Sequence, residues 1–256
     1  FVATWHGSDI NLRPFINSEL KNSIKKLLEN AEHNFFVSQK LLDKSILISQ
    51  TAKKSVLYTG PAEQFFKRDK KDTLRIKNEL NIDTEHVVGF VGSLIPIKNI
   101  QVLPEIFQKL QQEFDSISFI IVGDGKLDKQ LKLKFKSLKI RNLHFYGKKK
   151  PNDMPAIMNC LDVLVIPSLN EGLPRVTLEA LSCGVHVVGS DRGGIPEAIG
   201  EENCFSLNHE FIENATKRIS HFLENPKIEA VMNERFSWDN AVNQEVLIHR
   251  DIFLKK

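Results

Sequence analysis

From residue 87 onward, short apolar runs of strand length alternate with stretches of helical periodicity. The runs predicted as strands are Val87–Gly92, Ser118–Gly123, Leu143–Tyr146, Val163–Pro167, Val185–Ser190 and a weaker Asn203–Leu207. The stretches predicted as helices are Asn99–Glu113, Lys126–Leu138, Asp153–Cys160, Pro174–Ser182 and Pro196–Gly200. Strands and helices that alternate at this spacing form βαβ units with parallel strands. The alternation therefore predicts an α/β fold with a doubly wound, Rossmann-like parallel sheet.

Residues 1–66 repeat this alternation over a shorter length. The expected strands are Phe1–Trp5, Asn34–Ser38 and Ser55–Tyr58, and the expected helices are Ser18–Glu32 and Lys40–Gln50. We interpret residues 1–66 as the C-terminal part of a first Rossmann-like domain, with the passage to the next domain near Gly60–Asp72. A complete second domain then spans residues 67–237, and residues 238–256 form a helix that packs outside the sheet. Because the chain opens on an inner strand, we expect it to be part of a longer protein.

Composition excludes several classes of protein. The net charge of +3 over 256 residues is too small to predict nucleic-acid binding. The three cysteines (Cys160, Cys183 and Cys204) lack the spacing of metal ligands, and their odd number fits a reducing compartment such as the cytoplasm. No apolar run reaches the roughly 18 residues that a membrane-spanning helix needs.

Two carboxylates, Glu171 and Glu179, flank a predicted helix start after the strand Val163–Pro167. Pro174 is favoured at a first helical position, which places Glu171 in the strand-to-helix loop and Glu179 inside the helix. Backbone N–H groups at such a helix start attract anions. The corner therefore suits a diphosphate flanked by two hydroxyl-bearing sugars, one for each carboxylate. Taken alone, the two glutamates are explained as readily by electrostatic capping of the helix and by a solvated helix position.

Two more loops follow predicted strands and are expected at the same edge of the sheet. In Phe90–Asn99, Gly92 permits a tight turn and Lys98 places an ammonium group at a helix start, where a phosphate would lie. A lone lysine of this kind is more often a surface residue beside an ordinary turn. In Ile121–Lys126, the glycines are consistent either with a plain turn or with a loop, around Gly123, that holds a nucleotide base.

Two further motifs have open interpretations. In Ser190–Glu197, a glycine pair precedes a helix that starts with proline, so its amides can approach a ligand or simply form a turn. In Thr4–Asp9, His6 stands at a strand end beside glycine, where it can contact a substrate hydroxyl. A single histidine is more often structural.

The stretch Lys126–Arg141 carries seven basic residues against one acid, with apolar residues between them. A basic amphipathic helix can lie on anionic lipid, so peripheral membrane contact is one interpretation. The stretch also occupies a helix position of the βαβ pattern. Packing of its apolar face on the sheet is therefore the simpler explanation.

Together these motifs resemble glycosyltransferase family 4, whose members are retaining nucleotide-sugar transferases with the GT-B fold. The matching segments occur in the family's order across nearly the whole chain, and the spacing of Glu171 and Glu179 is their most specific element. These segments are His6–Asp9, Val37-Ser38, Phe90–Leu94 with Lys98, Val122–Gly125, Phe145–Gly147, Asp162–Ser168, Glu171–Pro174, Glu179-Ala180, Gly184-Val185 and Gly193–Glu197.

The resemblance implies a GT-B enzyme whose second domain binds a UDP-, GDP- or ADP-sugar. By the family's pattern, Glu171 holds hydroxyls of the donor sugar and Glu179 binds the ribose. Amides of Gly172 and Leu173 meet the diphosphate. Lys98 neutralises charge on the leaving nucleoside diphosphate in place of a metal ion, so no metal or other cofactor is expected.

The same pattern implies roles for residues in other loops. His6 matches the first-domain histidine that reaches the transferred sugar, and the loops at Gly92, Gly123 and Tyr146–Lys148 border the phosphates and the base. Transfer retains the anomeric configuration, by attack on the same face through an oxocarbenium-like state. Ser93 departs from the pattern, because the family often has arginine there. Lys126 and Arg192 are candidates to supply the missing charge.

The implied function is a glycosyltransferase that builds a surface polysaccharide or lipid-linked glycan at the cytoplasmic face of the membrane. Its partners are then a nucleotide-sugar donor and a glycan or lipid-linked acceptor. The alternative is a non-catalytic nucleotide-sugar-binding module or partner subunit, which Ser93 and the short first domain favour. A Rossmann-type nicotinamide dehydrogenase requires a Gly-x-Gly-x-x-Gly motif after its first strand, and here Asp128 stands where the third glycine would be.

Overall fold

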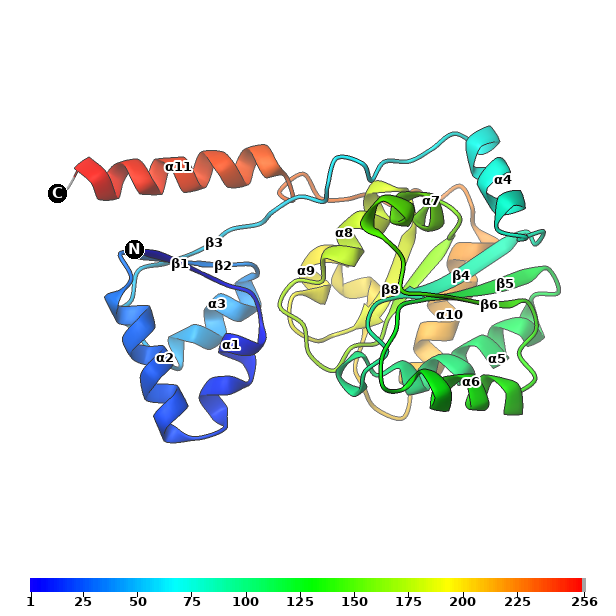
Figure 1. The fold of residues 1–256 in the computed structure, drawn as a ribbon, viewed down its shortest axis with the longest axis horizontal. Helices are drawn as coiled ribbons and strands as arrows, with labels where there is room; N and C mark the ends of the chain where they lie inside the picture. Colours follow the sequence, from blue (N-terminus) through cyan, green and yellow to red (C-terminus); the bar gives the residue numbers. More distant parts are fainter. Residues whose placement is uncertain (255–256) are drawn as a thin grey trace.

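The computed structural model describes residues 1–254 and contains two separate parallel sheets (Figure 1). The first sheet has the order β1-β2-β3 and the second has the order β6-β5-β4-β7-β8-β9. The strands are β1 (Val2–Trp5), β2 (His33–Phe36), β3 (Lys54–Val56), β4 (His86–Val91), β5 (Ile117–Val122), β6 (Leu143–Gly147), β7 (Val163–Ile166), β8 (His186–Ser190) and β9 (Cys204–Phe205). Every neighbouring pair is parallel, which confirms the α/β prediction for both regions.

Helices cover both faces of the second sheet. The α-helices are α1 (Ser8–Asn11), α2 (Ser18–Asn30), α3 (Gln39–Ile46), α4 (Lys70–Glu79), α5 (Leu103–Glu113), α6 (Asp128–Ser137), α7 (Met154–Met158), α8 (Arg175–Ser182), α9 (Ile195–Ile199), α10 (Phe211–Glu224) and α11 (Trp238–Leu254). Short 3-10 helices lie at Arg13–Phe15, Pro96–Lys98, Ile100–Val102, Pro151–Asp153 and Glu201–Asn203.

The apolar residues of β4 show how the two layers form. Successive side chains of a strand point to opposite faces. Val87 accordingly lies in a core with residues of α4, α7, α8 and α9, and Val88 lies in a second core with α5, α6 and α10. Figure 1 shows these two sets of helices on opposite sides of the sheet. The result is the three-layer arrangement expected of a doubly wound domain.

The first sheet is covered in the same way, but by helices from both ends of the chain. Phe36 packs with residues of α1, α2 and α3, whereas Phe35 points to the other face, toward Ala241 of α11. The side-chain amide of Gln244 in α11 also donates a hydrogen bond to the Val56 carbonyl at 2.8 Å. The sequence placed this helix outside the sheet. The structure shows that it crosses back and packs on the first one (Figure 1).

The chain therefore passes twice between the two domains, in residues 57–69 and residues 225–237. These two connections lie side by side, since the Tyr58 and Phe236 rings meet at 5.1 Å and the Trp238 indole donates to the Pro61 carbonyl at 2.8 Å. At their far end, Lys67 and Glu229 form an exposed ion pair at 3.9 Å. We call these two paired connections the hinge.

Most predicted elements lie within a few residues of the observed ones, with three informative differences. Helix α8 begins at Arg175 because Pro174 keeps an extended backbone (ψ 112°). The helix predicted from Asn99 starts as a 3-10 turn, since Asn99 is left-handed (φ 50°), and α5 begins only at Leu103. Helix α3 ends at Ile46 rather than near Gln50.

The basic helix α6 packs on the sheet through Leu131 and Phe135, which are buried, as the simpler interpretation predicted. Leu133 points away and is 69% exposed. Across residues 1–254, no helix combines the length and hydropathy needed to cross a membrane.

Candidate functional site

The order of the second sheet reverses between β4 and β7, because β5 and β6 extend it on one side and β8 and β9 on the other. Ligands of open α/β sheets bind outside the carboxyl ends of the strands at such a switch point. The loops after β4 and β7 meet there, where the Leu169 N–H donates to the Ile97 carbonyl at 2.8 Å. Topology alone thus identifies these two loops as the candidate site.

An ion pair joins the two loops. Lys98, at the end of a 3-10 helix after β4, places Nζ 2.6 Å from Oε1 of Glu171 in the loop after β7. The two side chains are only 26% and 12% exposed, so water screens their charges incompletely. The structure therefore brings together the two residues that the sequence proposed for the phosphate and for the donor sugar.

The loop around Glu171 is held by close backbone contacts that admit only glycine. A Cβ on Gly172 would lie 1.8 Å from the His6 carbonyl oxygen, and one on Gly193 would lie 1.9 Å from the Glu171 carbonyl oxygen. The Gly194 N–H donates to the Gly172 carbonyl at 2.8 Å. The glycine pair before α9 is therefore a support for the Glu171 loop, a more specific function than the turn that its sequence indicated.

Two backbone donors in this loop are unused. Within residues 1–254, neither the Gly172 nor the Leu173 N–H makes a hydrogen bond, although Gly172 is buried. Buried N–H groups are nearly always paired, so free ones at a helix start mark a place where an acceptor can bind. These are the amides that the sequence associated with a diphosphate.

The first domain contributes the other wall of the site. The Asp9 carboxylate accepts hydrogen bonds from the His6 N–H at 3.1 Å and the Gly7 N–H at 2.7 Å, which fixes the turn that follows β1. Asn11, which the sequence analysis missed, donates from Nδ2 to the Glu171 carbonyl at 3.0 Å. His6 is exposed, and its carbonyl faces Gly172. Because contacts of this kind join distant parts of the chain, no local pattern marks Asn11.

The loops after β4 and β5 press against each other beside this wall. A Cβ on Gly123 would lie 1.9 Å from the Gly92 carbonyl oxygen, and both residues have positive φ (136° at Gly123 and 155° at Gly92), which favours glycine at both positions. Their amides are used internally, since Gly92 N–H donates to Val122 and Gly123 N–H to Gly147. Ser93 is exposed between them. These loops shape the edge of the site.

Two predicted donor-binding residues have surroundings that the sequence could not indicate. Glu179 is half-buried in the second turn of α8, and burial raises the pKa of its carboxyl while Arg175 lowers it. The Tyr146 hydroxyl donates to the Leu80 carbonyl at 3.1 Å, so that group is already paired. Burial also raises the pKa of Tyr146.

Glu197, the last residue of the glycine motif, reaches across to the first domain. Its two carboxylate oxygens accept hydrogen bonds from the Gln39 N–H at 2.7 Å and the Lys40 N–H at 2.8 Å, at the start of α3. The Tyr58 hydroxyl donates to the same carboxylate at 2.7 Å. The sequence of this motif predicted either a turn or a ligand-binding loop and indicated no function for Glu197.

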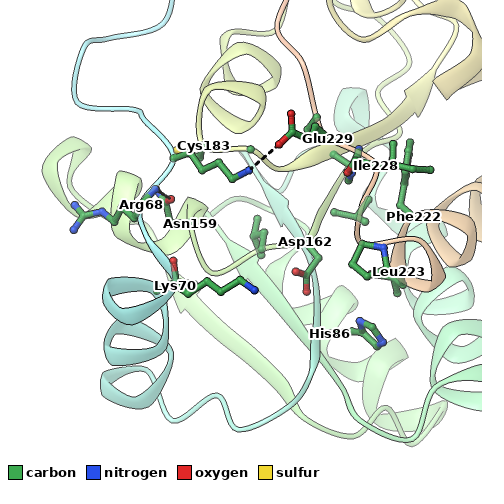
Figure 2. Close-up of a pocket in the computed structure, with 18 of the residues that line it drawn as sticks. Arg68, Lys70, His86, Asn159, Asp162, Cys183, Phe222, Leu223, Ile228 and Glu229 are labelled. Carbon is green, nitrogen blue, oxygen red and sulfur yellow. Dashed lines mark hydrogen bonds and ion pairs between the residues drawn. The ribbon is translucent and has the colours of Figure 1, made fainter.

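A cavity of about 660 Å³ lies at the opposite edge of the second sheet, beside the first residues of β4, β7 and β8. Lys67 and Glu229, which form an ion pair, both line it, and Figure 2 shows Glu229 and Asp162 among the lining residues. Burial raises the pKa of Asp162. None of the residues predicted to bind the donor lines this cavity, so we do not assign it to the donor.

The chain is similar to several known proteins. A family model described as glycosyl transferases group 1 matches residues 72–237. A putative teichuronic acid biosynthesis glycosyltransferase, TuaC of Bacillus subtilis, is 29% identical over 87% of this chain and 54% of its own length. The N-acetyl-alpha-D-glucosaminyl L-malate synthase of Bacillus anthracis is 28% identical over 77% of this chain and 51% of its own. The chain thus spans about half the length of these relatives.

Two solved structures have the same arrangement of elements. The sucrose-phosphate synthase of Thermosynechococcus elongatus superposes with a TM-score of 0.81 at 17% identity, over 100% of this chain and 68% of that one. Anabaena HepE in complex with UDP and glucose superposes with a TM-score of 0.76 at 23% identity, over 99% of this chain and 70% of that one. These likenesses show that the chain has the GT-B type of fold.

Proposed function

Because the chain belongs to the glycosyl transferases group 1 family, we propose that its site transfers a sugar from a nucleoside-diphosphate sugar to a glycan or lipid-linked acceptor. We further assign it to the retaining enzymes of family 4. The observation that supports this proposal most strongly is the conjunction at the switch point of a lysine, a carboxylate and two unused backbone N–H groups.

The ion pair indicates how the donor would bind. A diphosphate that approaches the free amides of Gly172 and Leu173 also approaches Lys98, whose ammonium group can exchange its carboxylate partner for a phosphate oxygen. Glu171 is then released to accept hydrogen bonds from sugar hydroxyls. Donor binding thus converts one internal ion pair into two contacts of opposite charge with the donor.

Bond cleavage places negative charge on the leaving diphosphate and positive charge on the sugar. Lys98 and the two amides would stabilise the first charge, and Glu171, on the sugar side, the second. The acceptor would attack the face from which the diphosphate departs, which retains the anomeric configuration. His6 would contact the transferred sugar from the first domain, and Glu179 the ribose. In this mechanism Lys98 replaces a metal ion, and no other cofactor is required.

The choice of donor and acceptor rests on similarity. The HepE complexes contain UDP, and in one case UDP-glucose, so we propose a UDP-sugar as donor, with a GDP-sugar as the second choice. The name of the TuaC relative suggests an acceptor in surface polysaccharide synthesis. We place this synthesis at the cytoplasmic face of the membrane, with α6 and its exposed Leu133 as a candidate for peripheral contact.

A second candidate function is donor binding without transfer. Ser93, which is exposed between the phosphate-side loops, supports it, because the resemblance implies an arginine at this position. A serine can donate one hydrogen bond but adds no charge.

Calorimetric titration with UDP, GDP and ADP, each with and without magnesium, tests the proposal. We expect one nucleotide to bind with micromolar affinity independently of magnesium. Lys98→Ala should weaken this binding roughly 10- to 100-fold, the loss expected for a hydrogen bond between charged groups. Lys109→Ala is the matched control, since Lys109 of α5 forms an exposed ion pair with Glu213 of α10.

Failure of all three nucleotides to bind would contradict the donor site. Binding without transfer in the full-length protein would support the second candidate.

A further inference from the structure

We propose that Glu197 is a positioning residue. Its hydrogen bonds to the first domain, called the lock below, hold that domain in a fixed position against the Glu171 loop, so that both walls of the site keep their relative placement. The positioning role rests on the function proposed above. The lock itself is a property of the fold and can be tested without any substrate.

The contacts of Glu197 cross the domain boundary. Its carboxylate belongs to α9 of the second domain, while two of its three donors are the Gln39 and Lys40 amides of the first. The third donor, the Tyr58 hydroxyl, lies in the first connection between the domains. One side chain therefore ties α9 to α3 and to the hinge.

The chemistry favours a strong contact. The first N–H groups of a helix have no partner within the helix, and they attract negative charge. In α3, the Ser38 hydroxyl caps Leu41 N–H at 3.3 Å and Glu197 takes the two amides before it. Hydrogen bonds between a carboxylate and backbone amides are about twice as strong as neutral ones. Without Glu197, the amides of Gln39 and Lys40 would have to bind water.

The lock is connected directly to the candidate site. Glu197 lies three residues after Gly194, whose N–H donates to the Gly172 carbonyl, and Gly193 abuts the Glu171 carbonyl. A Cβ on Gly194 would also lie 2.8 Å from Cβ of Ser38, which shows how closely α3 approaches this loop. A shift of α3 relative to α9 would therefore move the first domain, which carries His6, relative to the loop that carries Glu171.

Residues of the hinge also contact Glu197 and its partner Tyr58. The Arg235 guanidinium donates to the Glu197 carbonyl and stacks over the Tyr58 ring at 4.8 Å. It also lies 4.9 Å from the Phe236 ring. Because Tyr58 and Arg235 belong to the two different connections, Glu197 stands where both meet α3.

Amide hydrogen exchange, followed by NMR on the 256-residue chain, tests the lock. In Glu197→Ala we expect the Gln39 and Lys40 amides to exchange at least about tenfold faster, because their acceptor is gone. Glu197→Gln keeps one acceptor oxygen and should give a smaller increase. Glu201→Ala removes an exposed glutamate from the same domain and should leave the exchange rates of both amides unchanged.

Exchange of these amides at the wild-type rate in Glu197→Ala would overturn the proposal. Unchanged protection of β4 and β5 establishes that the variant is folded.

A second measurement separates positioning from folding. For Glu197→Ala we expect nucleotide affinity within about twofold of wild type, because Lys98 and the free amides remain, but a fall in kcat for transfer of at least about tenfold. Wild-type kcat, or nucleotide affinity that falls in parallel with kcat, would contradict the positioning role. If no nucleotide binds even to the wild type, the proposed function fails while the exchange experiment still decides on the lock.

Discussion

Lys98 and Glu171 depend on each other in the absence of a ligand. Each would be a poorly solvated single charge if the other were removed, since only 26% and 12% of their side chains are exposed. A partly buried pair of this kind costs more to break than to replace as a whole. In a donor complex, the same two residues would supply a positive charge to the phosphates and a negative charge to the sugar.

Lys98 and Glu171 should therefore have a measurable coupling energy in the free energy of unfolding. In a double-mutant cycle of Lys98→Ala and Glu171→Ala, followed by urea unfolding, we expect the double variant to be more stable than the sum of the single losses by about 1–2 kcal/mol. Additive losses would show that solvent already screens the pair. Lys109→Ala with Glu213→Ala, an exposed pair at 2.9 Å, is the control, and it should couple by less than about 1 kcal/mol.

For transfer itself, Glu171→Ala should reduce kcat at least about 100-fold, corresponding to roughly 2.7 kcal/mol of transition-state stabilisation. Circular dichroism should show an unchanged fold, since Glu171 lies in a loop. Transfer at a near wild-type rate in the full-length protein would remove this residue from the mechanism.

Tyr58 provides a pH-dependent signal at the hinge. Burial, followed by the hydrogen bond and the negative charge of Glu197, raises the pKa of Tyr58 to about 12. The folded protein thus keeps a proton that the unfolded chain loses near pH 10. The stability due to Tyr58 is fully present below pH 10 and is lost as the pH rises from 10 to about 12.

The chain has two tyrosines, so Tyr146→Phe leaves Tyr58 as the only source of tyrosinate absorbance. We expect its midpoint near pH 12 and a lower midpoint once Glu197→Gln is added, because the carboxylate charge is removed. An ordinary midpoint near pH 10 in the folded protein would contradict the observed contact.

The elements around the site are placed by close backbone contacts between their loops, such as the contact of Gly172 with His6. Gly172→Ala would bring a methyl group to 1.8 Å from the His6 carbonyl oxygen, so the first domain must shift. We expect a loss of stability of more than about 2 kcal/mol together with loss of transfer. Gly147→Ala is the control, because nothing lies within 4 Å of its Cβ and its cost is limited to the positive φ of 62°. Equal thermal stability of the two variants would contradict the close contact.

The sequence predicted most elements because the core residues follow simple periodicities. Strand β5 is buried at every position and α8 lies within the predicted helix Pro174–Ser182, since both elements obey local patterns. It did not predict the partner of Tyr146, the bond from Asn11 to Glu171, or the contacts of Glu197. These contacts join residues 66, 160 and up to 158 positions apart, and apart from the Tyr58 hydroxyl their partners are backbone groups that carry no side-chain signature.

The two domains share the chain in an interleaved way, because α11 packs on the first domain although it follows the second domain in the sequence. Ala241, which is 3% exposed, is the centre of its contact with Phe35 and Leu57. We expect Ala241→Asp to destabilise the first domain by about 2–4 kcal/mol, since a charge would be buried without a partner. Its neighbour Val242 is 51% exposed, so Val242→Asp is the matched control.

Limited proteolysis measures this difference. Cleavage within α11 should accelerate in Ala241→Asp and remain at the wild-type rate in Val242→Asp. Equal resistance of both variants would show that α11 does not depend on this contact.

The return of α11 has a consequence for biosynthesis. Residues 1–56 leave the ribosome before the second domain, but the face of their sheet that bears Phe35 meets α11 only after all of β4–β9 has been translated. Domains generally fold as units while the chain emerges. The second domain therefore has all of its strands before α11 is translated, and until then the apolar face of the first sheet that bears Phe35 stays uncovered by this helix.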